Sequence, residues 1–137
     1  MIPILADDED LRQFVEMTAQ RYDYVNEQAR FYGAKFLLFW QPILWVETCE
    51  VALSVREQEK DYAINKARFL AVRENFKVTY EALAQRLRDK PYFIDFKNIL
   101  CSRTTEVYKH DGVHLHDAGR MMVAKEISRV LQERGLR

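Results

Sequence analysis

Two short apolar runs constrain the fold of this chain more than any other feature, because stretches with helical spacing surround them. The first, residues 35–40, reads Lys-Phe-Leu-Leu-Phe-Trp and ends before Pro42. The second, residues 92–96, reads Tyr-Phe-Ile-Asp-Phe and follows Pro91. Short runs without polar alternation are typical of strands that are covered on both faces. The sequence therefore predicts an α/β protein in which helices dominate and cover a small sheet.

Three stretches have the spacing of amphipathic helices. Residues 8–32 begin with acidic side chains, which favour the first turn of a helix, and end at Gly33. A second helix is expected over residues 57–89, and a third after Asp117, its expected N-cap, ending before Gly135. The second helix carries a heptad-like stripe, which suits either the outer layer of a sheet or pairing with another helix. The stripe consists of Tyr62, Lys66, Phe69, Arg73, Phe76, Tyr80, Leu83 and Leu87.

Length and composition indicate one domain over residues 1–137, with no linker or internal repeat. The 21 basic residues balance the 21 acidic ones, so no net field favours nucleic acid or an anionic membrane as a partner. The longest apolar stretch, residues 36–46, is too short for a membrane span and is broken by Gln41-Pro42. The first residues lack the pattern of a secretory signal, so we expect a cytoplasmic chain as the sequence stands, whereas a missing N-terminal part would leave the compartment open.

The cysteines and histidines do not have the spacing of a metal site. Cys49 and Cys101 have apolar neighbours, and we interpret them as two buried free thiols in preference to a disulfide. His110, His114 and His116 alternate, which would place them on one side of an extended segment. No cysteine or acid pair stands at ligand spacing to complete a metal shell. We therefore predict no metal and no cofactor, with one histidine as a base and two loop histidines.

Residues 111–119, Asp-Gly-Val-His-Leu-His-Asp-Ala-Gly, combine acids, imidazoles and glycines just before an apolar-periodic segment. Asp111 precedes His114 by three residues, on a turn that Gly112 loosens, so its carboxylate can accept the proton of one ring nitrogen. The other ring nitrogen is then available as a base, which is the base-plus-orienter half of a nucleophilic triad. The alternative interpretation is that Asp111 and His114 only brace a turn before a helix.

This block resembles the last conserved block of the SGNH (GDSL-like) hydrolases, through residues 111–115, Asp117, Gly119, Val123-Ala124 and Ile127. The resemblance implies a Ser-His-Asp ester hydrolase in which Asp111 orients His114, the general base, without a metal or cofactor. It also implies parallel strands in a three-layer, flavodoxin-like sheet. Members often carry an acid near the position of Asp95, although we interpret Asp95 as a cap for the turn that follows it.

The rest of the family pattern is absent from this sequence. There is no Gly-Asp-Ser block and no Gly-x-Asn-Asp block, which would supply the nucleophile and the oxyanion-hole donors. The resemblance thus covers the C-terminal half of such a domain, and we expect the chain alone to be inactive. The substrate would be an ester, either a small molecule or an acylated glycan.

Because the rest of the family pattern is absent, we also expect the chain to need a partner. Two strands leave unpaired edges, so we predict a homodimer or association with the missing N-terminal half. Residues 43–55 are apolar without a period, and they either pack in the core or line an acyl pocket beyond the first strand. The alternative function is a non-catalytic helical interaction protein derived from the fold, which dimerises through the heptad-like stripe.

Overall fold

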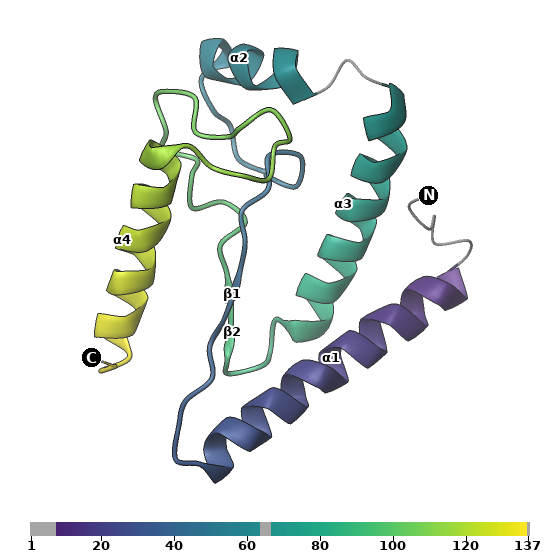
Figure 1. Ribbon diagram of the computed structural model, residues 1–137, viewed down its shortest axis with the longest axis vertical. Helices are drawn as coiled ribbons and strands as arrows, with labels where there is room; N and C mark the ends of the chain where they lie inside the picture. Colours follow the sequence, from purple (N-terminus) through teal and green to yellow (C-terminus); the bar gives the residue numbers. More distant parts are fainter. Residues whose placement is uncertain (1–7, 64–66, 137) are drawn as a thin grey trace. The chain divides into compact units, whose positions relative to one another are not determined.

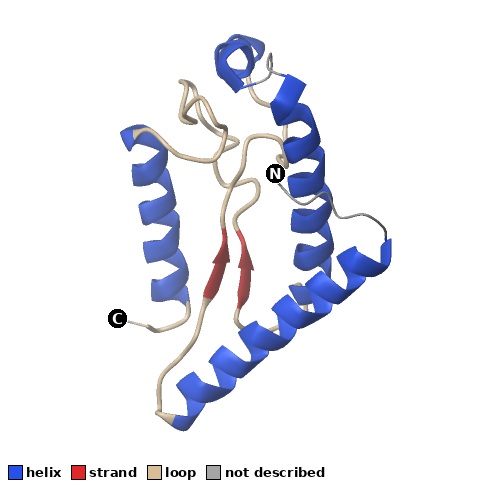
Figure 2. Cartoon of the chain, turned by 45° about the vertical axis from the view of Figure 1, so that its right-hand side comes forward, coloured by secondary structure: helices blue, strands red, loops and turns tan. Residues whose placement is uncertain are grey.

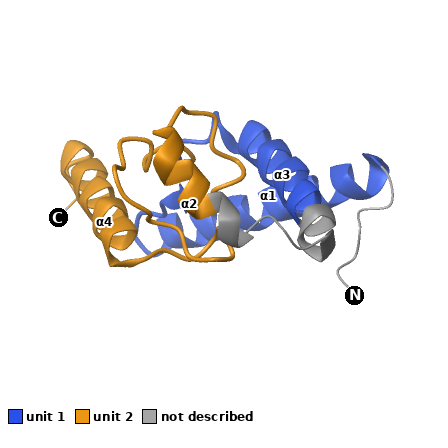
Figure 3. Cartoon of the chain, turned by 90° about the horizontal axis from the view of Figure 1, so that it is seen from above, with its two compact units in different colours: residues 1–41, 68–96 blue, residues 42–67, 97–137 orange. Residues whose placement is uncertain are grey.

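The computed structural model describes residues 8–63 and 67–136, with side chains described for residues 8–59 and 73–136. Its elements in chain order are α1 (Asp8–Phe31), β1 (Leu38–Trp40), α2 (Leu53–Ala63), α3 (Ala67–Leu87), β2 (Phe93–Asp95) and α4 (Asp117–Glu133), as Figure 1 shows. The chain falls into two compact units, coloured separately in Figure 3. Unit 1 comprises Met1–Gln41 and Arg68–Phe96, and unit 2 comprises Pro42–Ala67 and Lys97–Arg137. One domain over residues 1–137 stays a prediction.

Unit 1 contains the sheet that the two apolar runs predict. The strands β1 and β2 run parallel (Figure 2). Leu38 pairs with Phe93, and Trp40 pairs with Asp95. The described chain is thus a mixed α/β protein with parallel strands, in which helices predominate. Side chains from α1, α3 and the strand segments form its core, and these are Ala19, Tyr22, Phe36, Leu38, Leu87, Tyr92 and Phe93.

Helix α1 agrees closely with the predicted residues 8–32. Acidic residues fill its first turn, and Gly33, with a φ of +72°, ends it in a conformation that favours glycine. Asp23 fastens α1 to the segment before β2, because its carboxylate accepts hydrogen bonds from Lys90 Nζ at 2.9 Å and from the Tyr92 hydroxyl at 2.7 Å. Burial alone would raise the pKa of Asp23, but these two hydrogen bonds outweigh it and lower the pKa.

The structure describes the side chains of only part of the heptad-like stripe. The structure has two helices, α2 and α3, where we predicted one from 57 to 89, and residues 64–66 between them lie outside the described residues. The side chains of Tyr62, Lys66 and Phe69 also lie outside them. Tyr80, Leu83 and Leu87 are buried, and Leu87 packs in the core of unit 1. The last three residues of the stripe are therefore part of the chain's own core, whereas Phe76 is exposed, and dimerisation stays a prediction.

Unit 2 consists of long loops, α2 and α4. Its core contains Leu44, Leu100, Val107 and Tyr108, with Trp45, Ile99, Leu115, Met122 and Val123 packed against them. Our prediction that Asp117 is the N-cap of α4 was wrong, because His116 is the N-cap and Asp117 is the first helical residue. The His116 amide donates to Val107 O at 2.8 Å, which holds His116 in extended backbone, so the helix begins directly after it.

The interpretation of two free thiols was also wrong, because Cys49 and Cys101 form a disulfide with their Cα atoms 6.0 Å apart. The two cysteines are 52 residues apart, so their spacing carried no sign of the bond. Neighbouring contacts align the two segments: Thr48 N donates to Asn98 Oδ1 at 3.1 Å, and Asn98 Nδ2 donates to Thr48 Oγ1 at 2.9 Å. The disulfide therefore joins segments that also hydrogen-bond to each other.

Among the described residues, no helix combines the length and the apolar character that a bilayer crossing needs.

Candidate catalytic pair

Residues 108–115 form a hairpin that places Asp111 and His114 in one tight turn. An isolated antiparallel bridge joins Tyr108 to Leu115 at its base. Closer to the tip, the Lys109 amide donates to His114 O at 2.8 Å, and the Gly112 amide donates to Lys109 O at 2.8 Å. Gly112 has a φ of +67°, a conformation that side chains disfavour and that this turn requires. The local sequence thus brings the predicted acid and histidine together.

The Asp111 carboxylate is bound at both oxygens. Oδ1 accepts the backbone amides of Val113 at 3.0 Å and His114 at 2.9 Å, and Oδ2 lies 2.5 Å from His114 Nδ1. With Nδ1 engaged by Asp111, Nε2 is the ring nitrogen that can serve as a base. The His114 side chain is 76% exposed, so the pair lies at the surface of unit 2. The contact is compatible with the predicted roles of His114 as base and Asp111 as orienter, which stay predictions.

The pKa of Asp111 reflects these contacts. Burial alone would raise it, but the hydrogen bond with the His114 ring, followed by those from the two backbone amides, lowers the pKa to about 2. The carboxyl group is therefore ionised near neutral pH and accepts the Nδ1 proton. An ionised Asp111 fixes the tautomer of His114 and stabilises the imidazolium that forms when Nε2 takes up a proton.

We predict that the turn is lost in acid at an unusually low pH. Because the pKa of Asp111 falls from 3.8 to about 2 on folding, its contribution to stability is complete above pH 3.8 and is lost as the pH falls through about 2. An NMR titration of the Asp111 carboxyl carbon should give a midpoint near pH 2. A midpoint close to 3.8 would show that the carboxylate is not bound as described. In Asp111→Asn, the acid sensitivity that this group contributes should be absent.

The turn also packs against the segment that follows β1. The Leu44 amide donates to Gly112 O at 2.9 Å, so the 43–46 segment holds the turn by a backbone hydrogen bond. Gly112 is buried, and a Cβ added there would lie 2.2 Å from Trp45 Cζ3, well inside van der Waals contact. The indole ring thus occupies the space of a side chain at position 112, and glycine is required there for two independent reasons.

We expect Gly112→Ala to lower the free energy of unfolding by about 3 kcal/mol, from the disfavoured φ together with the collision with Trp45. Gly33→Ala is the matched control, because Gly33 has a similar positive φ of +72° but nothing lies within 4 Å of an added Cβ. The control should cost only about 1 kcal/mol, from backbone strain. Urea denaturation measures both. Equal losses for the two variants would mean that Trp45 does not press on Gly112.

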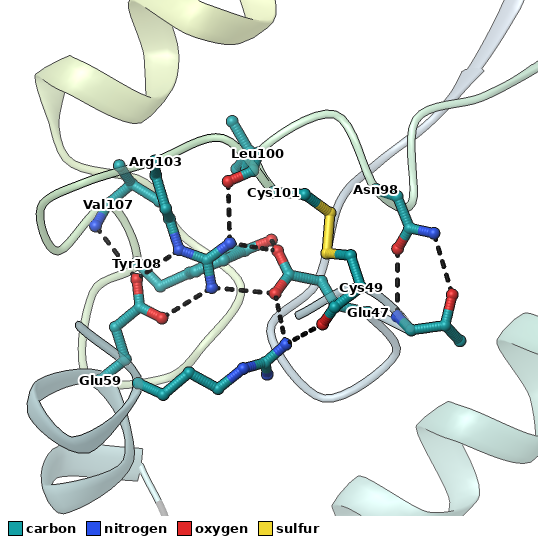
Figure 4. A network of polar contacts seen from close by, with 11 residues as sticks. Glu47, Cys49, Glu59, Asn98, Leu100, Cys101, Arg103, Val107 and Tyr108 are labelled. Atoms are coloured by element: carbon teal, nitrogen blue, oxygen red, sulfur yellow. Dashed lines mark hydrogen bonds and ion pairs between the residues drawn. A yellow bond between two sulfur atoms is a disulfide. The ribbon is translucent and has the colours of Figure 1, made fainter. Parts of the chain in front are cut away.

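A buried ion-pair network braces the same unit, and the sequence did not point to it (Figure 4). Arg103 is only 4% exposed. Its Nε donates to Glu59 at 2.9 Å, and its Nη2 donates to Glu59 at 2.7 Å and to Glu47 at 2.9 Å. Its Nη1 donates to Glu47 at 2.8 Å and to Leu100 O at 2.9 Å. Every N–H of the guanidinium therefore has an acceptor.

The carboxylates of Glu47 and Glu59 accept further hydrogen bonds. The Tyr108 hydroxyl donates to Glu47 Oε1 at 2.8 Å, and the Val107 amide donates to Glu59 Oε1 at 3.3 Å. Burial, followed by the charge of Glu47, raises the pKa of Tyr108, so its hydroxyl stays protonated. Carboxylates engaged in this way brace the loop and are not available to a substrate. The network fixes Val107 and Tyr108, directly before the turn that carries Asp111.

The structure joins His114 to Asp111 but not to a nucleophile. No hydrogen bond among the described residues connects His114 to a serine, and Ser54, Ser102 and Ser128 are the serines of the sequence. His116 Nε2 lies 3.8 Å from Glu106 Oε1. Within the described ranges, no three His, Cys, Asp or Glu side chains are placed to hold a metal ion. Asp95 is the last residue of β2, and its role as a cap for the turn that follows stays a prediction.

No protein-family model, curated protein or solved structure matches this chain.

Proposed function

We propose that the chain is the C-terminal segment of an SGNH-like ester hydrolase and supplies its His-Asp pair. The observation that carries this proposal is the 2.5 Å contact between His114 Nδ1 and Asp111 Oδ2, in a block of residues that resembles the last block of that family. In the complete site, His114 Nε2 accepts the proton of a serine hydroxyl as the serine attacks the ester carbonyl. It then returns the proton to the leaving alcohol, while Asp111 stabilises the imidazolium.

The serine and the oxyanion-hole donors belong to the part of the domain that this chain lacks. Without them the pair cannot form or stabilise an acyl intermediate, so the 137-residue chain is expected to be inactive on esters. The substrate is an ester of a small molecule or an acylated glycan. A histidine with a side chain that is 76% exposed suits either, because substrate and the missing half can both reach it from the surface of unit 2.

The decisive experiment begins with the genomic sequence upstream of Met1, which should encode in frame a strand that ends in Gly-Asp-Ser. We predict that the extended protein hydrolyses p-nitrophenyl acetate, and that His114→Ala and Asp111→Asn each lower kcat about 10³-fold or more. His116→Ala is the control and should retain activity, since His116 contacts Glu106 rather than Asp111. An unrelated upstream region, or full activity in His114→Ala, would contradict the proposal.

We further propose that the protein works in an oxidising compartment and not in the cytoplasm that the sequence led us to expect. The support is the Cys49–Cys101 disulfide, because structural disulfides persist mainly outside reducing compartments. Alkylation of free thiols in intact cells, before lysis, tests this. Both cysteines should resist the reagent, whereas rapid modification of both would place the chain in a reducing compartment.

Non-catalytic self-association is the second candidate function, and the exposed apolar side chains of α1 favour it. Phe14, Met17, Tyr24 and Phe31 recur at helical spacing and are between 44% and 81% exposed. Such a stripe is the seam of a helix pair when a second helix covers it. Sedimentation velocity at micromolar concentration distinguishes the two states. A dimer without esterase activity in the extended protein would favour this second function, and a stable monomer would remove it.

A further inference from the structure

Trp45 contacts the turn of residues 111–114 at Gly112, which directly follows Asp111. Its ring carbons Cζ3, Cε3 and Cη2 fill the space that a Cβ on Gly112 would need, at 2.2, 2.7 and 2.9 Å from that point. The adjacent residue, Leu44, donates its amide to Gly112 O at 2.9 Å. Two consecutive residues of one segment thus hold the peptide of Gly112, one through a flat apolar surface and one through a hydrogen bond.

The geometry of the Asp111 carboxylate depends on that peptide. Asp111 Oδ1 accepts amides from Val113 and His114, which follow Gly112 directly, and Oδ2 reaches the imidazole only when this turn is closed. Rotation of the Gly112 peptide would move both amides away from Oδ1. A rigid ring against Gly112 opposes that rotation, because Trp45 also packs against the core of Leu44, Leu100 and Tyr108.

We propose that Trp45 is a positioning residue for the Asp111–His114 pair, which sets the tautomer of His114 by holding the Gly112 peptide in place. Its relevance to ester hydrolysis rests on the function proposed above, but the positioning itself is a property of the 137-residue chain. Trp45 acts through Gly112, not by contact with a substrate. The closing experiment therefore measures the state of His114 and does not depend on esterase activity.

The indole nitrogen takes no part in this role. Trp45 Nε1 is buried and has no hydrogen-bond partner among the described residues. Replacing Trp45 by phenylalanine removes this unsatisfied donor and keeps a flat aromatic ring against Gly112. Phenylalanine should therefore rescue the positioning, whereas leucine keeps apolar volume but offers no flat ring. This contrast separates positioning from the general need for a buried apolar side chain.

The test is the nitrogen chemical shifts of the His114 ring, recorded on the oxidised chain at a pH at which the imidazole is neutral. In the wild type and in Trp45→Phe, the shifts should show the Nδ1–H tautomer, with Nε2 unprotonated. In Trp45→Leu and Trp45→Ala, the population should shift by at least about twofold toward the Nε2–H tautomer, because the bond to Asp111 is no longer enforced.

Trp40→Ala is the matched control. Trp40 is also a tryptophan with a buried, unpartnered Nε1 among the described residues, but it lies in unit 1, with its ring centroid 4.9 Å from that of Tyr80. Its loss should lower stability and leave the His114 tautomer unchanged. If Trp45→Ala does not fold, Trp45→Leu decides. Wild-type shifts in a folded Trp45→Leu or Trp45→Ala would overturn the proposal, whatever the esterase assay of the extended protein shows.

Discussion

Arg103→Met is expected to lower the free energy of unfolding by about 3–5 kcal/mol, because it leaves two carboxylates buried without their cation. Both partner side chains, Glu47 and Glu59, have no solvent exposure in their ion pairs with Arg103. Burial alone would lower the pKa of Arg103, but the hydrogen bonds that it donates to Glu59 and Glu47 outweigh burial and raise the pKa, so the guanidinium stays charged. Urea denaturation of the oxidised protein measures the loss.

Arg129→Met is the matched control for Arg103→Met. Arg129 also pairs with two glutamates, Glu126 and Glu133, but its side chain is 53% exposed, so water replaces the lost contacts. Its removal should leave the urea midpoint of unfolding nearly unchanged. Adding Glu47→Gln and Glu59→Gln to Arg103→Met should recover part of the loss by removing the unpaired charges. Equal effects of the two arginine substitutions would show that the Arg103 network does not brace unit 2.

Reduction of the Cys49–Cys101 disulfide is expected to cause the second large loss of stability. The bond closes a loop of 52 residues, and the loop-entropy relation gives a stabilisation of about 4 kcal/mol for that length. The wild type should therefore unfold at a lower urea concentration when a reductant is present. The double variant Cys49→Ala, Cys101→Ala should unfold at this lower concentration with and without reductant. An unfolding midpoint of the wild type that the reductant does not change would contradict the prediction.

The disulfide and the Arg103 network are expected to be coupled. Both join the segment around Glu47 to the segment that contains Cys101 and Arg103 (Figure 4). When one cross-link is opened, the two segments separate more easily and the other cross-link contributes less, so the single losses should not add. Combining Arg103→Met with the double cysteine variant should give a loss smaller than the sum. That outcome would show that the disulfide and the Arg103 network stabilise the same pair of segments.

The helices and strands were largely readable from the sequence, because their signals are local. The spacing of apolar residues predicted α1 to within one residue at its end, and the two apolar runs predicted β1 and β2 with somewhat longer bounds. The pairing of Asp111 with His114 was readable for the same reason. Asp111 and His114 are three positions apart and Gly112 allows the turn between them, so short-range geometry suffices to bring carboxylate and imidazole together.

Only the tertiary structure decided the contacts between distant segments. Arg103 meets Glu59 and Glu47 across 44 and 56 residues, and no periodicity marks an arginine that will be buried. The disulfide and the contact of Trp45 with Gly112 have the same origin, since packing of the loops brings their partners together. The sequence by itself determined most of the elements and the Asp111–His114 turn, through local backbone preferences. The braces that hold this turn in place arise from packing, because burial removes water as the competing partner of charged and polar groups.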